Sequence, residues 1–171
     1  LRGNGGGLLH EAVNICNLFV DKDQVIVKTM GKLPRSNNTY KTTIPVHDPG
    51  IPLVVLIDSK SASASEIVAG ALQDLDRAVV MGQRSFGKGL VQTVMPLSRG
   101  RAIKLTTSRY YTPSGVSIHE RGIEPDISIQ RELGERTVIT PTRAEPEYDS
   151  DIEFALDTLK QNKRIVQSKA E

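Results

Sequence analysis

The chain has few of the residues that build disulfides, metal centres and nucleic-acid surfaces. A single cysteine, Cys16, excludes an internal disulfide, and with only three histidines it offers no sensible spacing for a zinc site. Only 4% of the residues are aromatic and the net charge is +2, so nothing favours nucleic-acid binding. No apolar run approaches the roughly 18 residues of a membrane span. Neither a cofactor nor a metal ion is expected.

What remains is the composition of an ordinary folded protein. The 171 residues are 38% hydrophobic and 25% charged, enough to bury a core. Short continuous apolar runs predict strands, and other stretches have the spacing of amphipathic helices, so both kinds of element are expected. We expect residues 1–130 to form the core, the polar residues 131–148 to form a linker, and residues 149–171 to form a helical tail. Cys16 lies in an apolar helical stretch and is interpreted as a core thiol.

One strand-to-helix turn carries candidate chemistry. The apolar residues 53–57 predict a buried strand, which gives way to three serines, Ser61, Ser63 and Ser65, and then to a helix with an apolar face. A serine before a helix is usually an N-cap. Here its hydroxyl would also lie beside unpaired helix N-terminal amides, which favour negative charge.

A lysine between glycines follows the next apolar run. Lys88 could act as the base that takes the proton of a serine nucleophile. Its pKa would then have to fall from about 10.4 to near 7 or 8, which burial among apolar neighbours achieves. Gln92, four residues later, could accept a hydrogen bond from the amine without adding charge. The neighbours available for that burial are Phe86, Leu90 and Val91.

The first residues form a glycine-rich turn. Four glycines between positions 3 and 7 predict positive φ angles or a close backbone approach, and a helix with a broad apolar face follows over residues 8–19. The amides of this turn could form one side of an oxyanion hole, bind a phosphate, or serve only as a turn. A strand–turn–helix unit would be complete if a strand preceded Leu1.

Further elements follow from alternation and turn residues. Strands are expected at residues 24–30, 101–111 and 127–129, and at an edge position over residues 40–46, where Pro45 lies. Residues 31–40 are expected to be a loop, and residues 150–166 a helix with Ile152, Ala155, Leu156 and Leu159 on one face.

Two other sites compete with the serine–lysine hypothesis. Residues 82–88 match the first seven positions of a phosphate-binding loop, but Gly89 stands where a hydroxyl must hold magnesium. The residues that follow predict a strand, whereas such a loop requires a helix. A Ser-His-Asp triad through His47 or His119 also stays open, because geometry and not chain order defines a triad.

Five segments together resemble the carboxyl-terminal processing peptidases, also called tail-specific proteases. The matching segments, in chain order, read LRGNGGGLL at residues 1–9, SASASEIVAGALQD at 61–74, FGKGLVQ at 86–92, LTTSRYYTPSG at 105–115 and GIEPDI at 122–127. Residues 131–171 match only weakly.

The resemblance implies a serine endopeptidase with a Ser/Lys dyad. Its nucleophile would be Ser63, its base Lys88, and Gln92 would support the lysine. The amide of Ala64 would provide one oxyanion donor, and Gly6 or Gly7 the other. A non-catalytic peptide-binding relative of the same fold is the alternative.

The resemblance also implies a mixed-sheet α/β core of the ClpP/crotonase type. Its partners would be protein or peptide substrates bound extended by their C-terminal segments, and it is compatible with a homo-oligomer. A PDZ domain is expected in the full-length parent, and the location would be extracytoplasmic, in a bacterial periplasm or cell envelope. The sequence lacks the PDZ domain and the strand that normally precede LRGN, so the fold is expected to be incomplete at its N-terminus.

Overall fold

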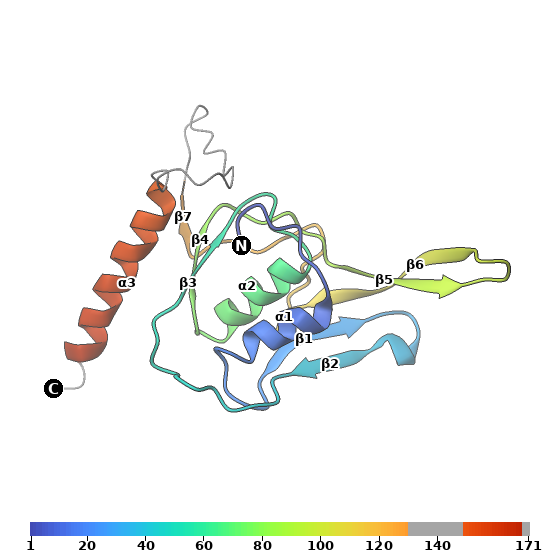
Figure 1. The fold of residues 1–171 in the computed structure, drawn as a ribbon, viewed down its shortest axis with the longest axis horizontal. Coiled ribbons are helices and arrows are strands. Elements are labelled where there is room, and N and C mark those ends of the chain that lie inside the picture. Colours follow the sequence, from blue (N-terminus) through green and yellow to red (C-terminus); the bar gives the residue numbers. More distant parts are fainter. Residues whose placement is uncertain (130–148, 169–171) are drawn as a thin grey trace.

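Two β-sheets lie on either side of a central helix (Figure 1). The structure is a computed structural model that describes residues 1–129 and 149–168, with side chains as far as residue 161. The central helix, α2 (Ala64–Asp74), contacts a strand of each sheet. The mixed α/β architecture expected from the sequence is confirmed, with the strands divided between the two sheets.

The smaller sheet is parallel and carries the first candidate turn. Its strands β3 (Val54–Ile57), β4 (Val79–Gly82) and β7 (Ile127–Ser128) lie in the order β3-β4-β7. The chain passes from β3 through α2 to β4, so α2 is the crossover that a parallel pair requires. The continuous apolar runs of the sequence form β3 and β4, because strands covered on both faces need no alternation.

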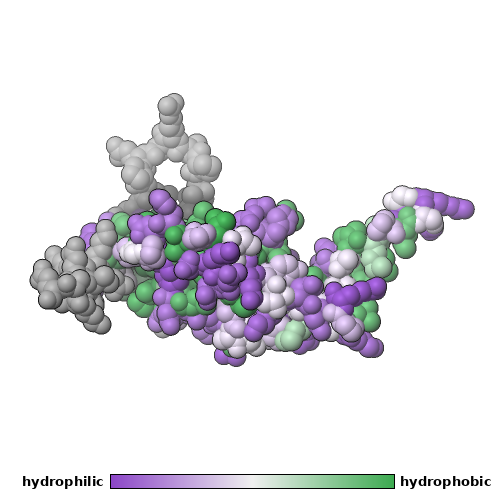
Figure 2. Space-filling model, turned by 90° about the horizontal axis from the view of Figure 1, so that it is seen from below, coloured by the Kyte–Doolittle hydropathy of each residue, from purple (hydrophilic) through white to green (hydrophobic). Residues whose placement is uncertain are grey.

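The larger sheet is antiparallel, with the order β2-β1-β6-β5. Its strands are β1 (Val25–Met30), β2 (Asn38–Lys41), β5 (Leu90–Pro96) and β6 (Ala102–Tyr111). The β5–β6 hairpin projects from the body of the molecule as an arm (Figure 1). Three apolar side chains of the arm are about two-fifths exposed: Met95, its pairing partner Ile103, and Leu105. Figure 2 shows hydrophobic colour along the arm.

The core fills the space around α1 (Leu9–Cys16) and α2. Cys16 is fully buried, and its burial raises the pKa of the thiol to about 12. The interpretation of Cys16 as a core thiol is confirmed. The other fully buried large side chains include Ile26, Ile57, Ile67, Leu72, Met81 and Ile118.

The expectation for residues 31–46 is wrong in its boundaries. The second strand is β2 at Asn38–Lys41, not residues 40–46, and the supposed loop contains a 3₁₀ helix at Pro34–Ser36. The residues of β2 are polar and show no alternation of apolar and polar side chains. They form a strand because they pair antiparallel with β1. Tertiary pairing here outweighs local preference.

A last helix, α3 (Ser150–Ser168), runs beside β3 on the outer side of the small sheet (Figure 1). Its buried positions are Asp151 and Ala155, whereas Ile152 and Leu156 are exposed, so the expected apolar face is only partly buried. The predicted linker, residues 131–148, lies outside the described residues. Among the helices that the structure describes, none combines the length and apolarity of a membrane span.

Candidate active site

Ser63 occupies the turn between β3 and α2. It is the N-cap of α2, with φ 57° and ψ −116°, a left-handed conformation that few residues other than glycine adopt. Its side chain is only partly buried. Strained backbone held at a helix N-terminus is a feature of functional sites.

The two neighbouring serines have structural roles. Ser61 is fully buried, donates to the Leu1 carbonyl at 2.9 Å and accepts a hydrogen bond from the Asp58 amide. Ser65 is 3% exposed within α2. Of the three candidate nucleophiles, Ser63 alone has an accessible hydroxyl.

The glycine-rich turn lies directly against Ser63. A Cβ at Gly6, whose φ is +92°, would stand 2.5 Å from the Ala62 carbonyl oxygen and 2.7 Å from the Ala64 nitrogen. The Gly6 amide donates to Asn4 Oδ1 at 2.8 Å. The amides of Gly7 and Ala64 have no hydrogen-bond partner among residues 1–129 and 149–168. Two unpaired N–H groups therefore belong to the two segments that meet at Ser63.

Asp58 fastens the glycine-rich turn to the end of β3. Its carboxylate accepts hydrogen bonds from the amides of Gly3, Lys60 and Ser61 at 2.9 to 3.0 Å. Partial burial alone would raise the Asp58 pKa, but these backbone hydrogen bonds outweigh burial and lower the pKa below its ordinary value of 3.8. An ionised carboxylate thus holds both segments of the site.

The loop that carries Lys88 runs from β4 to β5 and docks on the same helix end. The Phe86 amide donates to the Ser61 carbonyl at 2.9 Å, and the Glu120 amide donates to the Gly87 carbonyl at 2.9 Å. The backbone of this loop is therefore fixed on one side by the Ser63 turn and on the other by residues 118–123. The Lys88 side chain itself is exposed.

The expected burial of Lys88 is wrong for this chain. Phe86, expected to desolvate the amine, is itself 64% exposed. Val91 instead packs against the core. Gln92 is exposed on β5, and in the segments that the structure describes no hydrogen bond joins the Lys88 amine to Ser63 or to Gln92.

The phosphate-loop alternative is contradicted. Lys88 is followed by strand β5, not by the helix whose N-terminus would bind a phosphate. A Cβ at Gly89 would stand 2.3 Å from the backbone nitrogen of His119, so a side chain carrying the magnesium-binding hydroxyl could not be accommodated there.

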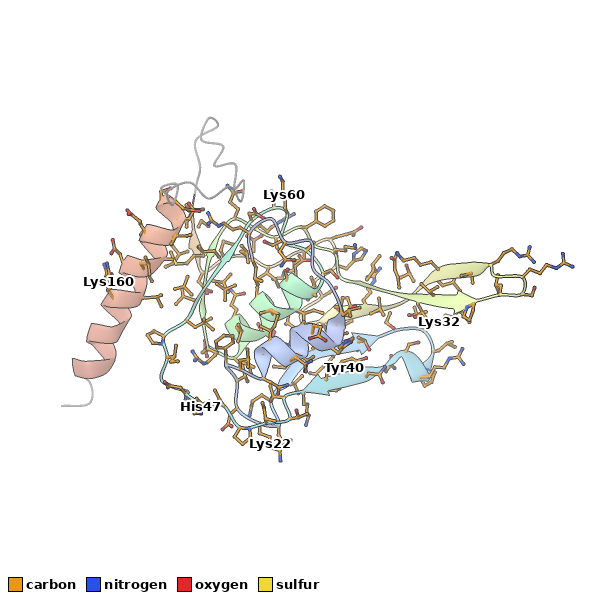
Figure 3. All side chains as sticks on the ribbon, viewed as in Figure 1. Lys22, Lys32, Tyr40, His47, Lys60 and Lys160 are labelled. Atoms are coloured by element: carbon orange, nitrogen blue, oxygen red, sulfur yellow. The ribbon has the colours of Figure 1, made fainter. Side chains whose placement is uncertain are left out.

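The histidines do not form a triad with Ser63. His47 lies on the opposite side of the molecule from Lys60, which belongs to the Ser63 turn (Figure 3). His119 lies next to Gly89, but its Nε2 faces Glu120 at 3.9 Å and its Nδ1 is buried without a partner. Within the described segments, no group of three or more His, Cys, Asp or Glu side chains could hold a metal ion.

Glu66, which was not among the residues predicted from the sequence, links the two candidate segments. Glu66 is fully buried in the first turn of α2. Its Oε2 accepts from the amides of Ser63 at 2.7 Å and Lys88 at 2.8 Å, and its Oε1 accepts from Ser85 Oγ and the Gly87 amide, both at 2.6 Å. The available signal was an acidic residue three positions after Ser63, within a helix whose other faces are apolar.

Comparison with known proteins shows to which family the chain is similar. The profile described as peptidase family S41 matches residues 1–129. The carboxy-terminal-processing protease of Bartonella bacilliformis is 47% identical over 136 residues, covering 80% of this chain and 31% of that protein. The chloroplastic C-terminal processing peptidase of Tetradesmus obliquus is 41% identical over 133 residues, covering 78% of this chain and 28% of that protein.

A solved structure is similar as well. The photosystem II D1 C-terminal processing protease has a TM-score of 0.69 and 41% identity, covering 75% of this chain and 33% of that one. The chain thus spans about a third of the length of the relatives it matches. The family profile covers well over half of the chain, and the chain belongs to peptidase family S41.

Proposed function

We propose that the chain carries the catalytic centre of a serine endopeptidase that cleaves protein substrates near their C-termini. Ser63 is the nucleophile and Lys88 is the general base. The observation that carries the proposal is the Ser63 turn: an accessible hydroxyl on strained backbone, with the loop of Lys88 docked on the same helix end. Family membership supports the same reaction class.

The proposed reaction follows from serine and amine chemistry. Neutral Lys88 accepts the Ser63 Oγ proton, and Oγ attacks the scissile carbonyl carbon to form a tetrahedral oxyanion. The protonated amine then gives its proton to the leaving nitrogen as the C–N bond breaks. Water, deprotonated by Lys88, releases the acyl group and regenerates Ser63. Gln92 accepts a hydrogen bond from the amine and orients it.

The amides of Ala64 and Gly7 suit the oxyanion hole. Both N–H groups lack a partner within the described residues, whereas the Gly6 N–H is occupied by Asn4. Gly6 serves as the spacer that lets the glycine-rich turn approach Ser63 closely. Of the two glycines proposed from the sequence, Gly7 is the better donor. Loss of one oxyanion donor typically costs about 100- to 1,000-fold in rate.

The edge strand β5 offers a place for an extended substrate. β5 is the outermost strand of its sheet and begins two residues after Lys88. A peptide that pairs with this free edge would add a strand through its backbone and place its scissile bond beside Ser63. The bound peptide would also cover the exposed Lys88 side chain. This covering would remove water from the amine, which Phe86 does not do.

The wider setting is proposed from the family alone. The full-length protein carries a PDZ domain that captures substrate C-termini, works outside the cytoplasm, and assembles as a homo-oligomer. Cell fractionation followed by sizing of the purified full-length protein tests the location and the assembly.

Single substitutions in the full-length protein test the dyad. We expect Ser63→Ala and Lys88→Ala each to lower peptide cleavage at least about 1,000-fold, because each removes a group that reacts. Ser59→Ala and Lys60→Ala are the matched controls, since both side chains are exposed in the same turn. The readout is cleavage of a C-terminal peptide together with labelling by a serine-directed phosphonate.

The pH dependence distinguishes the lysine base from other bases. Cleavage should rise with pH as Lys88 loses its proton, and a flat profile would refute this base. Because no hydrogen bond joins the Lys88 amine to Ser63 within the described residues, a non-catalytic peptide-binding relative is the second candidate. It predicts peptide binding without phosphonate labelling of the unaltered protein.

A further inference from the structure

Glu66 is a buried carboxylate whose hydrogen bonds all come from the two segments that carry the proposed dyad. The side chain is fully buried, and each oxygen accepts two donors. Three donors are backbone amides and the fourth is the hydroxyl of Ser85. Such a group has no free position through which it could act on a substrate.

The geometry makes one oxygen common to both proposed reacting residues. Glu66 Oε2 accepts from the Ser63 amide at 2.7 Å and from the Lys88 amide at 2.8 Å. No strand pairing joins these two segments, since Ser63 follows β3 and Lys88 precedes β5. The backbone hydrogen bond from Phe86 to Ser61 joins the segments at one point, and the shared oxygen bridges the amides of Ser63 and Lys88 themselves.

The Lys88 loop is shaped to receive this carboxylate. Gly87 has a φ of +88°, and the successive amides of Gly87 and Lys88 both point to Glu66. Consecutive amides around a left-handed residue form a concave anion-binding nest. A Cβ at Gly87 would stand 3.1 Å from backbone atoms of Glu120 and Gly122, so residues 118–123 close the other side.

We infer that Glu66 is the positioning residue that sets the separation of Ser63 and Lys88. This inference rests on the proposed dyad and assigns the control of its geometry to one side chain. Hydrogen bonds to a charged acceptor are stronger than neutral ones, so the carboxylate holds both segments more firmly than an amide could. An error of about 1 Å in such a separation typically costs about 100-fold in rate.

Glu66→Gln in the full-length protein tests the inference. The amide matches the shape of the carboxylate but turns an N–H toward donors, so it must push one segment away. We expect a fall in kcat of about 100-fold with little change in KM. We also expect the 15N–1H signals of both Ser63 and Lys88 to shift. Glu124→Gln is the control, because Glu124 is 64% exposed and its ion pair with Arg84 spans 3.8 Å.

Further measurements separate positioning from general stability. Glu66→Asp keeps the charge but shortens the side chain by one methylene. The carboxylate should then keep its hydrogen bonds to one of the two segments, and kcat should be intermediate. Hydrogen exchange on the unaltered protein needs no variant; the amides of Ser63, Gly87 and Lys88 should exchange slowly and together. Fast exchange of any of them, or a Glu66→Gln protein that cleaves at the wild-type rate, would overturn the inference. If the unaltered protein neither cleaves nor labels, the proposed function fails, while the signal shifts and hydrogen exchange still test Glu66.

Discussion

Ser63 keeps its left-handed backbone because its surroundings determine it. Its amide donates to Glu66, its carbonyl accepts from the amides of Glu66 and Ile67, and Gly6 approaches it from the other side. Left-handed conformations in residues other than glycine and asparagine cost about 1 to 3 kcal/mol. The folded structure bears this cost at the residue that the proposed reaction needs most.

The glycine-rich turn provides a matched pair of substitutions. Gly6→Ala would place a methyl group 2.5 to 2.9 Å from the Ser63 turn at a φ of +92°, whereas a Cβ at Gly7 has nothing within 4 Å. We expect Gly6→Ala to lower the rate of phosphonate labelling about 100-fold or more, because it displaces an oxyanion donor. Gly7→Ala keeps its amide and should label nearly normally. Equal labelling rates for the two variants would contradict this account of the turn.

Residue type and spacing indicated a serine before α2, with Lys88 and Gln92 as its partners, whereas the choice of Ser63 and the role of the Ala64 amide came from the family resemblance. The structure brings Ser63 and the loop of Lys88 onto one helix end. The exposure of Lys88 could not be predicted, because apolar residues beside a lysine in the chain need not cover it in space. Glu66 was missed for a similar reason. A glutamate in the first turn of a helix is usually a cap, and only the fold shows that a second segment shares its oxygens.

At the scale of elements, local pattern was enough where an element has its own hydrophobic signal. Strands β3 and β6 fall within about one residue of their predicted positions, and α2 begins at the serine-rich turn as expected. β2 did not, because its polar residues are ordered by β1 alone. The projection of the β5–β6 arm could not be predicted either. Alternation of apolar residues indicates which side chains share a face of a hairpin, but not which elements pack against that face.

Asp58 makes the junction of the turn and β3 sensitive to acid. Its pKa is lowered in the folded state, so its stabilisation is present above the ordinary value of 3.8 and is lost as the pH falls through the lower folded value. We expect Asp58→Asn to reduce the free energy of unfolding by about 1 to 2 kcal/mol at neutral pH. Urea unfolding of both proteins at pH 7 and near pH 3 tests this. The difference should shrink in acid, and a gap independent of pH would count against the assignment.

At the scale of the whole molecule, the proposed dyad bridges two structural halves. Ser63 lies in the turn that follows β3 of the parallel sheet. Lys88 lies on the connection from β4 of that sheet to β5 of the antiparallel sheet. Helix α2 contacts both sheets and holds both residues at its N-terminus. The halves must keep their relative placement for the two groups to meet.

Arg2 connects the beginning of the chain to the last helix. Its guanidinium pairs with Asp149 at 2.5 Å and with Asp151 at 2.6 Å, and the hydrogen bond from Arg2 lowers the pKa of Asp149. We expect Arg2→Ala to destabilise the fold by about 3 kcal/mol, since it removes the guanidinium that pairs with the largely buried Asp149 carboxylate. Thermal unfolding measures this, with the exposed Arg35→Ala as control. Protease sensitivity confined to α3 should rise in Arg2→Ala, and equal stability of both variants would contradict the link.

The projecting β5–β6 hairpin has a mechanical consequence. Gln92 lies at its root and Leu97 just past the end of β5, five residues or about 17 Å away along an extended chain. The hairpin is continuous with the connection between β4 and β5 that carries Lys88. A force applied at the tip would therefore act on the connection that carries Lys88 with a lever arm of about this length.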